Sequence, residues 1–289
     1  MEVLGALDFF EMAGDLYSAS KIKPSTGIWF SPGSRHYSWD KGANILNLGR
    51  NNLKKISVDE FCRMDLKELK EGLQECLEKK KPVIGVTAVF GTTQEGAVDD
   101  LEGILQMKKE FAEKGLTFYV HVDGAWGGYF ASCVSDRQAR PIQPTIVGVR
   151  RSVPVQHEAH DKAKRVGSGN GTGASCGRFL DSKLSRHFTW QLWCLKEANS
   201  VTLDPHKSGF CPYPAGGLLY RNGNIRNFLA QSAAYVSHGE GKNEEINLYG
   251  IDGSKPGAAS AGVWLSHKVI GLHHEGYGLI LRQSTLSGK

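Results

Sequence analysis

Hydrophobic and polar positions alternate with two different periods along the chain. A period near 3.6 residues predicts amphipathic helices, and short β-branched runs bounded by glycine, proline or charged residues predict strands. Asp65 stands where it can cap one helix, and Gly115 stands where another would end. The helical pattern covers 36–48, 64–81, 99–115, 187–200, 225–236 and 262–283, and the strand pattern covers 52–59, 82–90, 116–123, 200–204 and 217–221.

The order of these elements predicts an α/β fold. Strand, helix, strand, helix, strand at this spacing implies a mainly parallel sheet with helices on both faces. Ligands of such sheets gather at the carboxyl ends of the strands. We therefore expect the chemistry of the chain just after Phe90, around Asp123 and after Leu203.

One stretch departs from this rhythm. Residues 134–186 have no sustained period, and the span from Val134 to Phe188 holds ten Lys or Arg against four acids. Because the whole chain carries a net charge of +5, the remainder is close to neutral. We interpret 134–186 as a basic, glycine-rich irregular insertion between two parts of one domain, 1–133 and 187–289. A nucleic-acid partner is therefore not expected.

Composition excludes several other classes of protein. The 289 residues are 40% hydrophobic, which is enough for a globular core. No apolar run approaches the roughly 20 residues that cross a bilayer, and the first residues lack the positive segment of a signal peptide. The six cysteines form no CxxC pair, so we expect neither a metal site nor a disulfide framework. These features predict a soluble, cytoplasmic protein with no membrane association.

Two motifs suggest other chemistry, but their surroundings argue against it. The glycine-rich segment 167–173 (GSGNGTG) looks like a nucleotide-binding loop, yet no hydrophobic strand precedes it, which favours a linker. His157 and His160 flank Glu158, but they lack the i,i+4 spacing of a zinc-binding helix. Surface histidines are the better interpretation.

Asp123 and Lys207 are the most informative polar residues. Each follows a hydrophobic strand, and each alone could be a turn former or a solvated surface residue. Together they stand at the carboxyl ends of two strands of one predicted sheet. Pyridoxal phosphate needs this pair, because a lysine amine holds it as a Schiff base and a carboxylate keeps its ring nitrogen protonated.

Five segments resemble, in order and approximate spacing, the pyridoxal-phosphate-dependent group II amino-acid decarboxylases, and the nearest likeness is to bacterial-type tyrosine decarboxylases. The most specific are 119–130 (YVHVDGAWGGYF) and 200–217 (SVTLDPHKSGFCPYPAGG). The others are 29–49, 83–104 and 251–264. The resemblance covers about residues 20–133 and 187–280, and it implies a fold-type I large domain that is truncated at both ends.

The resemblance also implies a role for individual residues. Lys207 would carry the cofactor, Asp123 would bind its ring nitrogen, and Tyr213 would return a proton to the product. His36 is expected to stack on one face of the ring and Ala125 on the other, although His36 could simply cap a helix. His206, Thr92 and Ser254 complete the expected cofactor contacts, with Ser254 reaching the neighbouring subunit of a homodimer. Asp204 is left out, because an anion there would repel phosphate unless it faces away.

The expected function is pyridoxal-phosphate-dependent decarboxylation of an L-amino acid, with an aromatic, tyrosine-like substrate favoured. The alternative is a truncated, inactive remnant that binds the cofactor or pairs with a full-length subunit. An aminotransferase would share Lys207 and Asp123, but the His-Lys pair and the RHYSW motif at 35–39 argue against it.

Overall fold

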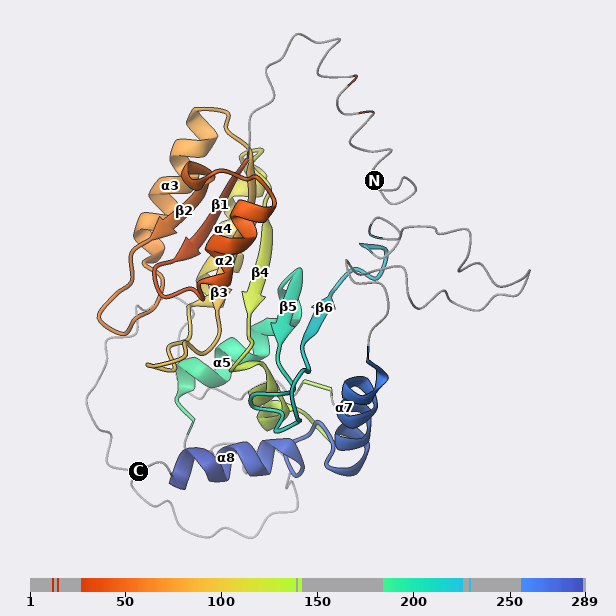
Figure 1. The fold of residues 1–289 in the computed structure, drawn as a ribbon. Helices are drawn as coiled ribbons and strands as arrows, with labels where there is room; N and C mark the ends of the chain where they lie inside the picture. Colours follow the sequence, from red (N-terminus) through yellow and green to blue (C-terminus); the bar gives the residue numbers. More distant parts are fainter. Residues whose placement is uncertain are drawn as a thin grey trace, which may run out of the picture.

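The described strands form one sheet in the order β2-β1-β3-β4-β5-β6 (Figure 1). A computed structural model of the chain describes residues 27–138, 140–141, 184–225 and 256–287, together with 12, 15 and 229. The first five strands of the sheet are parallel, and β6 is antiparallel to β5. The strands are β1 (Ile28–Pro32), β2 (Leu53–Ile56), β3 (Val83–Val89), β4 (Tyr119–Asp123), β5 (Ser200–Leu203) and β6 (Gly217–Tyr220).

The mainly parallel sheet and all five strands predicted from the sequence are confirmed. β1 was not predicted, because its five residues (IWFSP) end in proline and stand close to further turn residues. It nevertheless lies inside the sheet, between β2 and β3. β1 therefore brings the segment that follows it, from Gly33 onward, to the same sheet edge as the loops after β3, β4 and β5.

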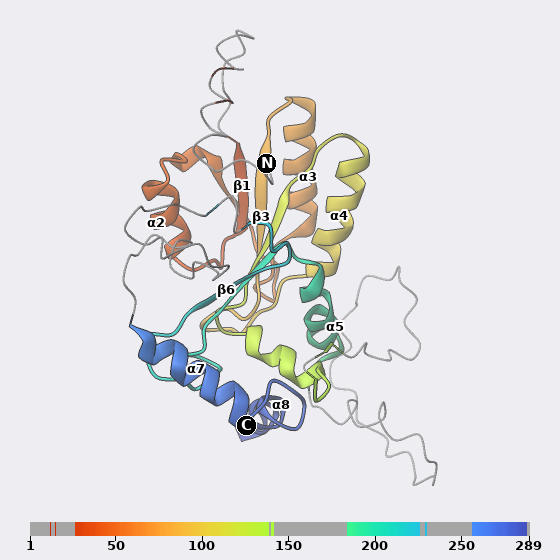
Figure 2. The ribbon, with the colours of Figure 1, turned by 90° about the vertical axis from the view of Figure 1, so that its right-hand side faces the viewer.

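Helices cover both faces of the sheet, as predicted. Figure 2 shows α3, α4 and α5 on one face and α2 on the other. The main core lies under the first group, where aliphatic side chains of β3 and β4 meet those of α3 and α4. The helices are α2 (Ser38–Ile45), α3 (Leu66–Glu78), α4 (Leu101–Glu113), α5 (Arg186–Cys194), α7 (Gly257–Val269) and α8 (Tyr277–Ser287).

The helix boundaries partly follow the sequence signals. The Asp65 carboxylate accepts the Lys67 and Glu68 amides at the start of α3, as predicted. The single helix predicted over 262–283 is wrong, since Gly271 adopts a φ of +83° and separates α7 from α8. The helix predicted over 225–236 falls almost entirely outside the described residues. Among the helices that the structure describes, none combines the length and apolar character needed to cross a bilayer.

Asp99 is a buried carboxylate that joins two segments of the fold. Its side chain accepts the Met64 amide on Oδ1 and the Val89 amide on Oδ2, each at 2.6 Å, and the residue is 2% exposed. Burial raises the pKa of Asp99 to about 7, and the two amide donors oppose that rise. The carboxyl group thus fastens the segment before α3 to the end of β3.

We expect Asp99→Asn to lower the free energy of unfolding by about 1–3 kcal/mol. A carboxyl group offers an oxygen to each amide, whereas the carboxamide nitrogen of Asn would face an N–H donor. Denaturant unfolding measures the loss. Asp100→Asn is the matched control, because Asn also caps helices and can accept the Gly103 amide that Asp100 now accepts.

The effect should depend on pH. Between pH 3.8, the usual pKa, and about 7, the unfolded chain has released the Asp99 proton while the folded chain keeps it. The contribution of Asp99 to stability therefore falls as pH rises through this window and is constant above it. The stability difference between wild type and Asp99→Asn, plotted against pH, should show this fall; a rise would contradict the assignment.

Candidate functional site

The face of the sheet toward α2 is polar, in contrast to the apolar face under α3 and α4. Successive side chains of a strand point to opposite faces. Phe30, Val86, Val120 and Val122 therefore enter the main core. The strand residues that point to the opposite face are Trp29, Ser31, Thr87, His121, Asp123 and Thr202. This alternation places hydrogen-bonding groups beneath α2.

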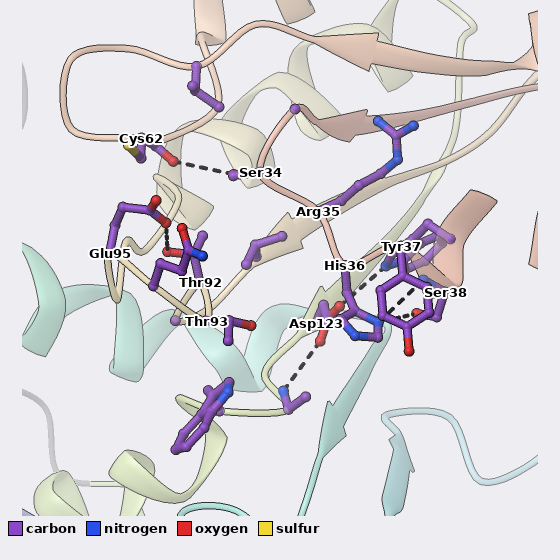
Figure 3. A pocket seen from close by; sticks show the side chains of 18 of the residues that line it. Ser34, Arg35, His36, Tyr37, Ser38, Cys62, Thr92, Thr93, Glu95 and Asp123 are labelled. Atoms are coloured by element: carbon purple, nitrogen blue, oxygen red, sulfur yellow. Dashed lines mark hydrogen bonds between the residues drawn. The ribbon is translucent and has the colours of Figure 1, made fainter. Parts of the chain in front are cut away.

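A cavity of about 1010 Å³ opens at the carboxyl ends of the strands on this face. All three strand ends predicted to hold chemistry border it, through Gly91–Glu95, Asp123–Trp126, and Asp204 with Lys207. Figure 3 shows Thr92, Thr93 and Glu95 on one side of this cavity, His36, Tyr37 and Ser38 on the other, and Asp123 between them. Parallel pairing of the strands explains why these segments, distant in sequence, meet.

Asp123 is held by two hydrogen bonds. Its Oδ2 accepts the Trp39 indole N–H at 3.3 Å, and its Oδ1 accepts the Ala125 amide at 3.3 Å. The Trp39 ring, which projects from α2, lies 5.5 Å from the rings of both Trp29 and His121. Aromatic packing thus fixes the orientation of the Trp39 indole, and the indole in turn fixes that of the Asp123 carboxylate. The sequence analysis assigned no role to Trp39, although it lies one helical turn after His36.

His121 lies on the same face, and both nitrogens of its ring contact hydroxyl groups. Its Nδ1 lies 2.7 Å from the Ser200 hydroxyl, and its Nε2 lies 3.1 Å from the Thr202 hydroxyl. Burial lowers the pKa of His121, an effect that nearby Asp123 partly opposes. The two-residue spacing of His121 and Asp123 on β4 could have placed both on one face from sequence alone.

Lys207 lies in a tight turn after β5 and borders the cavity. Its amide donates to the Asp204 carbonyl at 2.9 Å, and its Nζ pairs with Asp204 Oδ2 at 2.8 Å. Asp204 borders the cavity and does not face away, so the reason for which it was left out of the predicted contacts, repulsion of a phosphate group, still applies. Asp123 ends the neighbouring strand β4, and it pairs with Thr202 of β5 in the sheet register.

The other predicted residues in the cavity wall are His36, Thr92 and Ala125. The Nδ1 atom of His36 accepts the Ser38 amide at 3.3 Å, so the imidazole both borders the cavity and caps the start of α2. Thr92 is buried, and its hydroxyl donates to Glu95 at 3.0 Å while accepting the Ala97 amide. These contacts close the loop after β3 on itself.

Two predicted residues that the structure describes, His206 and Tyr213, do not border the cavity. The rings of His206 and Tyr213 stack with centroids 3.8 Å apart, and the His206 Nδ1 contacts the Ala215 backbone. Tyr213 is 74% exposed. Ser254 lies outside the described residues. The side chains of His206 and Lys207 both lie near the Asp204 carboxylate, but of the two only Lys207 borders the cavity, which a motif alone does not predict.

Two walls of the cavity pack without space between them. The Gly127 amide donates to the Phe90 carbonyl at 2.9 Å, and a side-chain carbon on Gly127 would lie 2.2 Å from that oxygen. Gly91 faces the same contact with a φ of +94°. Glycine at both positions lets the loop after β3 touch the loop after β4.

The chain is similar to pyridoxal-dependent decarboxylases. Residues 11–148 match the family described as the pyridoxal-dependent decarboxylase conserved domain. This match includes three of the five segments that carry the resemblance, 29–49, 83–104 and 119–130, and the chain is similar to that family over these residues.

Among the curated relatives are bacterial tyrosine decarboxylases. The chain is 34% identical over 259 residues to L-tyrosine decarboxylase of Enterococcus faecium, a match that covers 89% of this chain and 39% of that protein. It is 33% identical to the Enterococcus faecalis protein of the same name, with 92% and 40% covered. The chain thus spans about 40% of the length of these relatives.

Solved structures share the fold. Mouse CSAD in its apo form matches with a TM-score of 0.57 and 20% identity, over 87% of this chain and 41% of that one. Catharanthus roseus tryptophan decarboxylase in complex with L-tryptophan matches with a TM-score of 0.56 and 14% identity, over 90% and 44%. These similarities confirm the predicted fold class.

A buried aromatic cluster fastens the Lys207 turn to α8. The Tyr277 hydroxyl donates to the Gly209 carbonyl at 2.9 Å, and its ring packs edge-on against Tyr129, with centroids 5.4 Å apart. The Tyr129 hydroxyl lies 2.9 Å from His267 Nε2, on α7. The two tyrosines are both buried and both rings lie close to the loop that contains Lys207, but it is the Tyr277 hydroxyl that donates to this loop, whereas the Tyr129 hydroxyl contacts His267.

We expect Tyr277→Phe to cost about 0.5–1.5 kcal/mol of stability and to increase amide exchange in 204–211. The ring keeps its packing, while the Gly209 carbonyl loses its buried donor. Thermal unfolding and hydrogen exchange measure the two effects. Tyr129→Phe is the matched control, with a similar stability loss but unchanged exchange in this loop. Equal exchange in both variants would show that α8 does not restrain the turn.

Proposed function

We propose that the chain binds pyridoxal 5′-phosphate in this cavity and is part of a protein that decarboxylates an aromatic, tyrosine-like L-amino acid. The observation that carries the proposal is the convergence of Asp123 and Lys207 on one cavity at the ends of adjacent strands. Homology to tyrosine decarboxylases supports the choice of substrate class. The proposed assembly is a homodimer.

The cavity suits a planar heteroaromatic aldehyde with a phosphate group. Its volume, about 1010 Å³, is at the upper end of the range for small-molecule sites. It offers a carboxylate for a ring nitrogen at Asp123, an amine for an aldehyde at Lys207, and the flat imidazole of His36 for stacking. Arg35 and Lys55 also border it; Arg35 is paired with Asp40, so Lys55 is the residue of the two that favours an anionic ligand.

When bound, pyridoxal phosphate supplies a protonated ring that accepts the electron pair left by departing carbon dioxide. The residues of the chain hold and orient the reacting groups. Asp123, fixed by Trp39 and Ala125, keeps a proton on the ring nitrogen. Lys207 supplies the amine that attaches the cofactor, and His36 and Ala125 flank the ring. Thr92, His206 and Ser254 are proposed further cofactor contacts, and Tyr213 is proposed to return a proton to the α-carbon.

A second candidate is a cofactor-binding chain without activity of its own. The observation that favours it is length, because the chain spans about 40% of the tyrosine decarboxylases it matches. In this case the chain would bind pyridoxal phosphate or pair with a full-length subunit, but would not release carbon dioxide. Both candidates use Lys207 for cofactor attachment.

Reductive labelling tests the shared part of the proposal. We expect pyridoxal phosphate followed by borohydride to label Lys207 well above other lysines, as located by peptide mass spectrometry. Lys207→Ala should remove this label. Lys70→Ala is the matched control, since Lys70 pairs with Glu110 on the surface and does not border the cavity, and labelling at Lys207 should stay unchanged. Labelling spread evenly over surface lysines would contradict the cofactor site.

Carbon dioxide release separates the two candidates. The chain with saturating pyridoxal phosphate is incubated with tyrosine, dihydroxyphenylalanine, tryptophan and glutamate. Release from the aromatic substrates that disappears in Lys207→Ala would support the decarboxylase. Labelling of Lys207 without release from any substrate would support the inactive binding chain, and preference for glutamate would overturn the substrate class.

A further inference from the structure

The Lys207 amine is paired with a carboxylate to which the proposed chemistry gives no role. Asp204 Oδ2 lies 2.8 Å from Lys207 Nζ and 3.6 Å from His206 Nε2. The Asp204 and Lys207 side chains are 15% and 23% exposed, so this pair is more shielded than an ordinary surface ion pair. Both residues border the cavity.

The pair restricts a side chain that would otherwise have many positions. A lysine has a flexible four-carbon stem, and the cavity beside Lys207 is wide. The backbone fixes the relative places of the two residues, because the Lys207 amide donates to the Asp204 carbonyl at 2.9 Å. The short Asp204 side chain, on the first residue of the turn, can therefore hold the amine of Lys207, on its last residue.

The same turn is connected to Asp123. The Asp204 amide donates to the Ala125 carbonyl at 3.3 Å, and the Ala125 amide donates to Asp123 Oδ1 at 3.3 Å. A continuous set of contacts thus relates the amine to the carboxylate proposed for the ring nitrogen. In contrast, direct contact between Asp204 and a phosphate group would be repulsive.

We propose that Asp204 is a positioning residue, which presents the Lys207 amine to an aldehyde entering the cavity. The inference rests on the proposed function, because it assumes that Lys207 is the residue that reacts. Its role is to hold Nζ within reach of the aldehyde carbon, and it makes no contact with the phosphate. Orientation of this kind changes the rate of condensation at Lys207 and leaves other lysines unaffected.

The test measures the rate of borohydride-trapped labelling at Lys207 in wild type, Asp204→Asn and Asp204→Ala. Condensation of the amine with the aldehyde releases one water, and borohydride then reduces the carbon–nitrogen double bond to a stable amine. Two aldehydes are used, pyridoxal phosphate and pyridoxal, which lacks the phosphate. Label on exposed Lys70 and Lys114 in the same sample is the internal standard for reagent reactivity.

We expect Asp204→Ala to slow labelling of Lys207 by roughly ten- to a hundredfold relative to the standard lysines, with both aldehydes. Asp204→Asn should recover part of the rate, because its amide oxygen can still accept a hydrogen bond from the amine. Glu197→Gln, which alters a surface carboxylate paired with Arg221, should leave the rate unchanged. Thermal unfolding of each variant shows whether the fold is kept.

Each other outcome overturns the inference in a distinct way. Unchanged labelling in both Asp204 variants would show that the turn alone positions the amine. Faster labelling with both aldehydes would show that the carboxylate restrains Lys207, and faster labelling with pyridoxal phosphate alone would show that it repels phosphate. Absence of label at Lys207 in wild type would instead refute the proposed function.

Discussion

Parallel pairing of β4 with β5 is the constraint on which the candidate site depends. The two strands are separated in sequence by residues 124–199, yet Asp123 stands opposite Thr202 in their register. Because parallel strands end at the same edge of a sheet, this pairing brings the loop after Asp123 beside the turn that contains Lys207. A shift of one residue would send His121 and Asp123 into the apolar core.

The two faces of the sheet have different roles, since one forms most of the described core and the other borders the candidate site. Aliphatic side chains on one face pack against α3 and α4 and form most of the described core. The alternate positions place hydroxyl, imidazole and carboxyl groups on the other face. There, Trp39 satisfies Asp123, while two hydroxyl groups satisfy His121. These partners make it tolerable to place Asp123 and His121 on this face, where the buried Ser31 hydroxyl, in contrast, has no partner among the described residues.

Sequence patterns predicted every described strand except β1 and placed three of the cavity's loops at the strand ends, but they did not predict the placement of side chains within the turns. The two-residue period determines on which face Asp123 lies, and strand order determines which loops meet. No comparable period exists within the turn 204–207, so only the structure showed that Asp204 borders the cavity while His206 packs against Tyr213. The contact of Trp39 with Asp123 likewise depends on how α2 crosses the sheet. The division into 1–133, 134–186 and 187–289 stays a prediction.

The close packing of Gly127 on Phe90 has a mechanical consequence. The loops after β3 and β4 touch through backbone atoms, with no side chain between them that could change rotamer. We therefore expect the loops after β3 and β4 to behave as one rigid part of the cavity wall. Adjustment to ligands of different size falls to the opposite border, where His36 and Tyr37 precede α2 and are exposed. If the cavity binds ligands as proposed, we expect differences in their shape to be accommodated at the His36 and Tyr37 border.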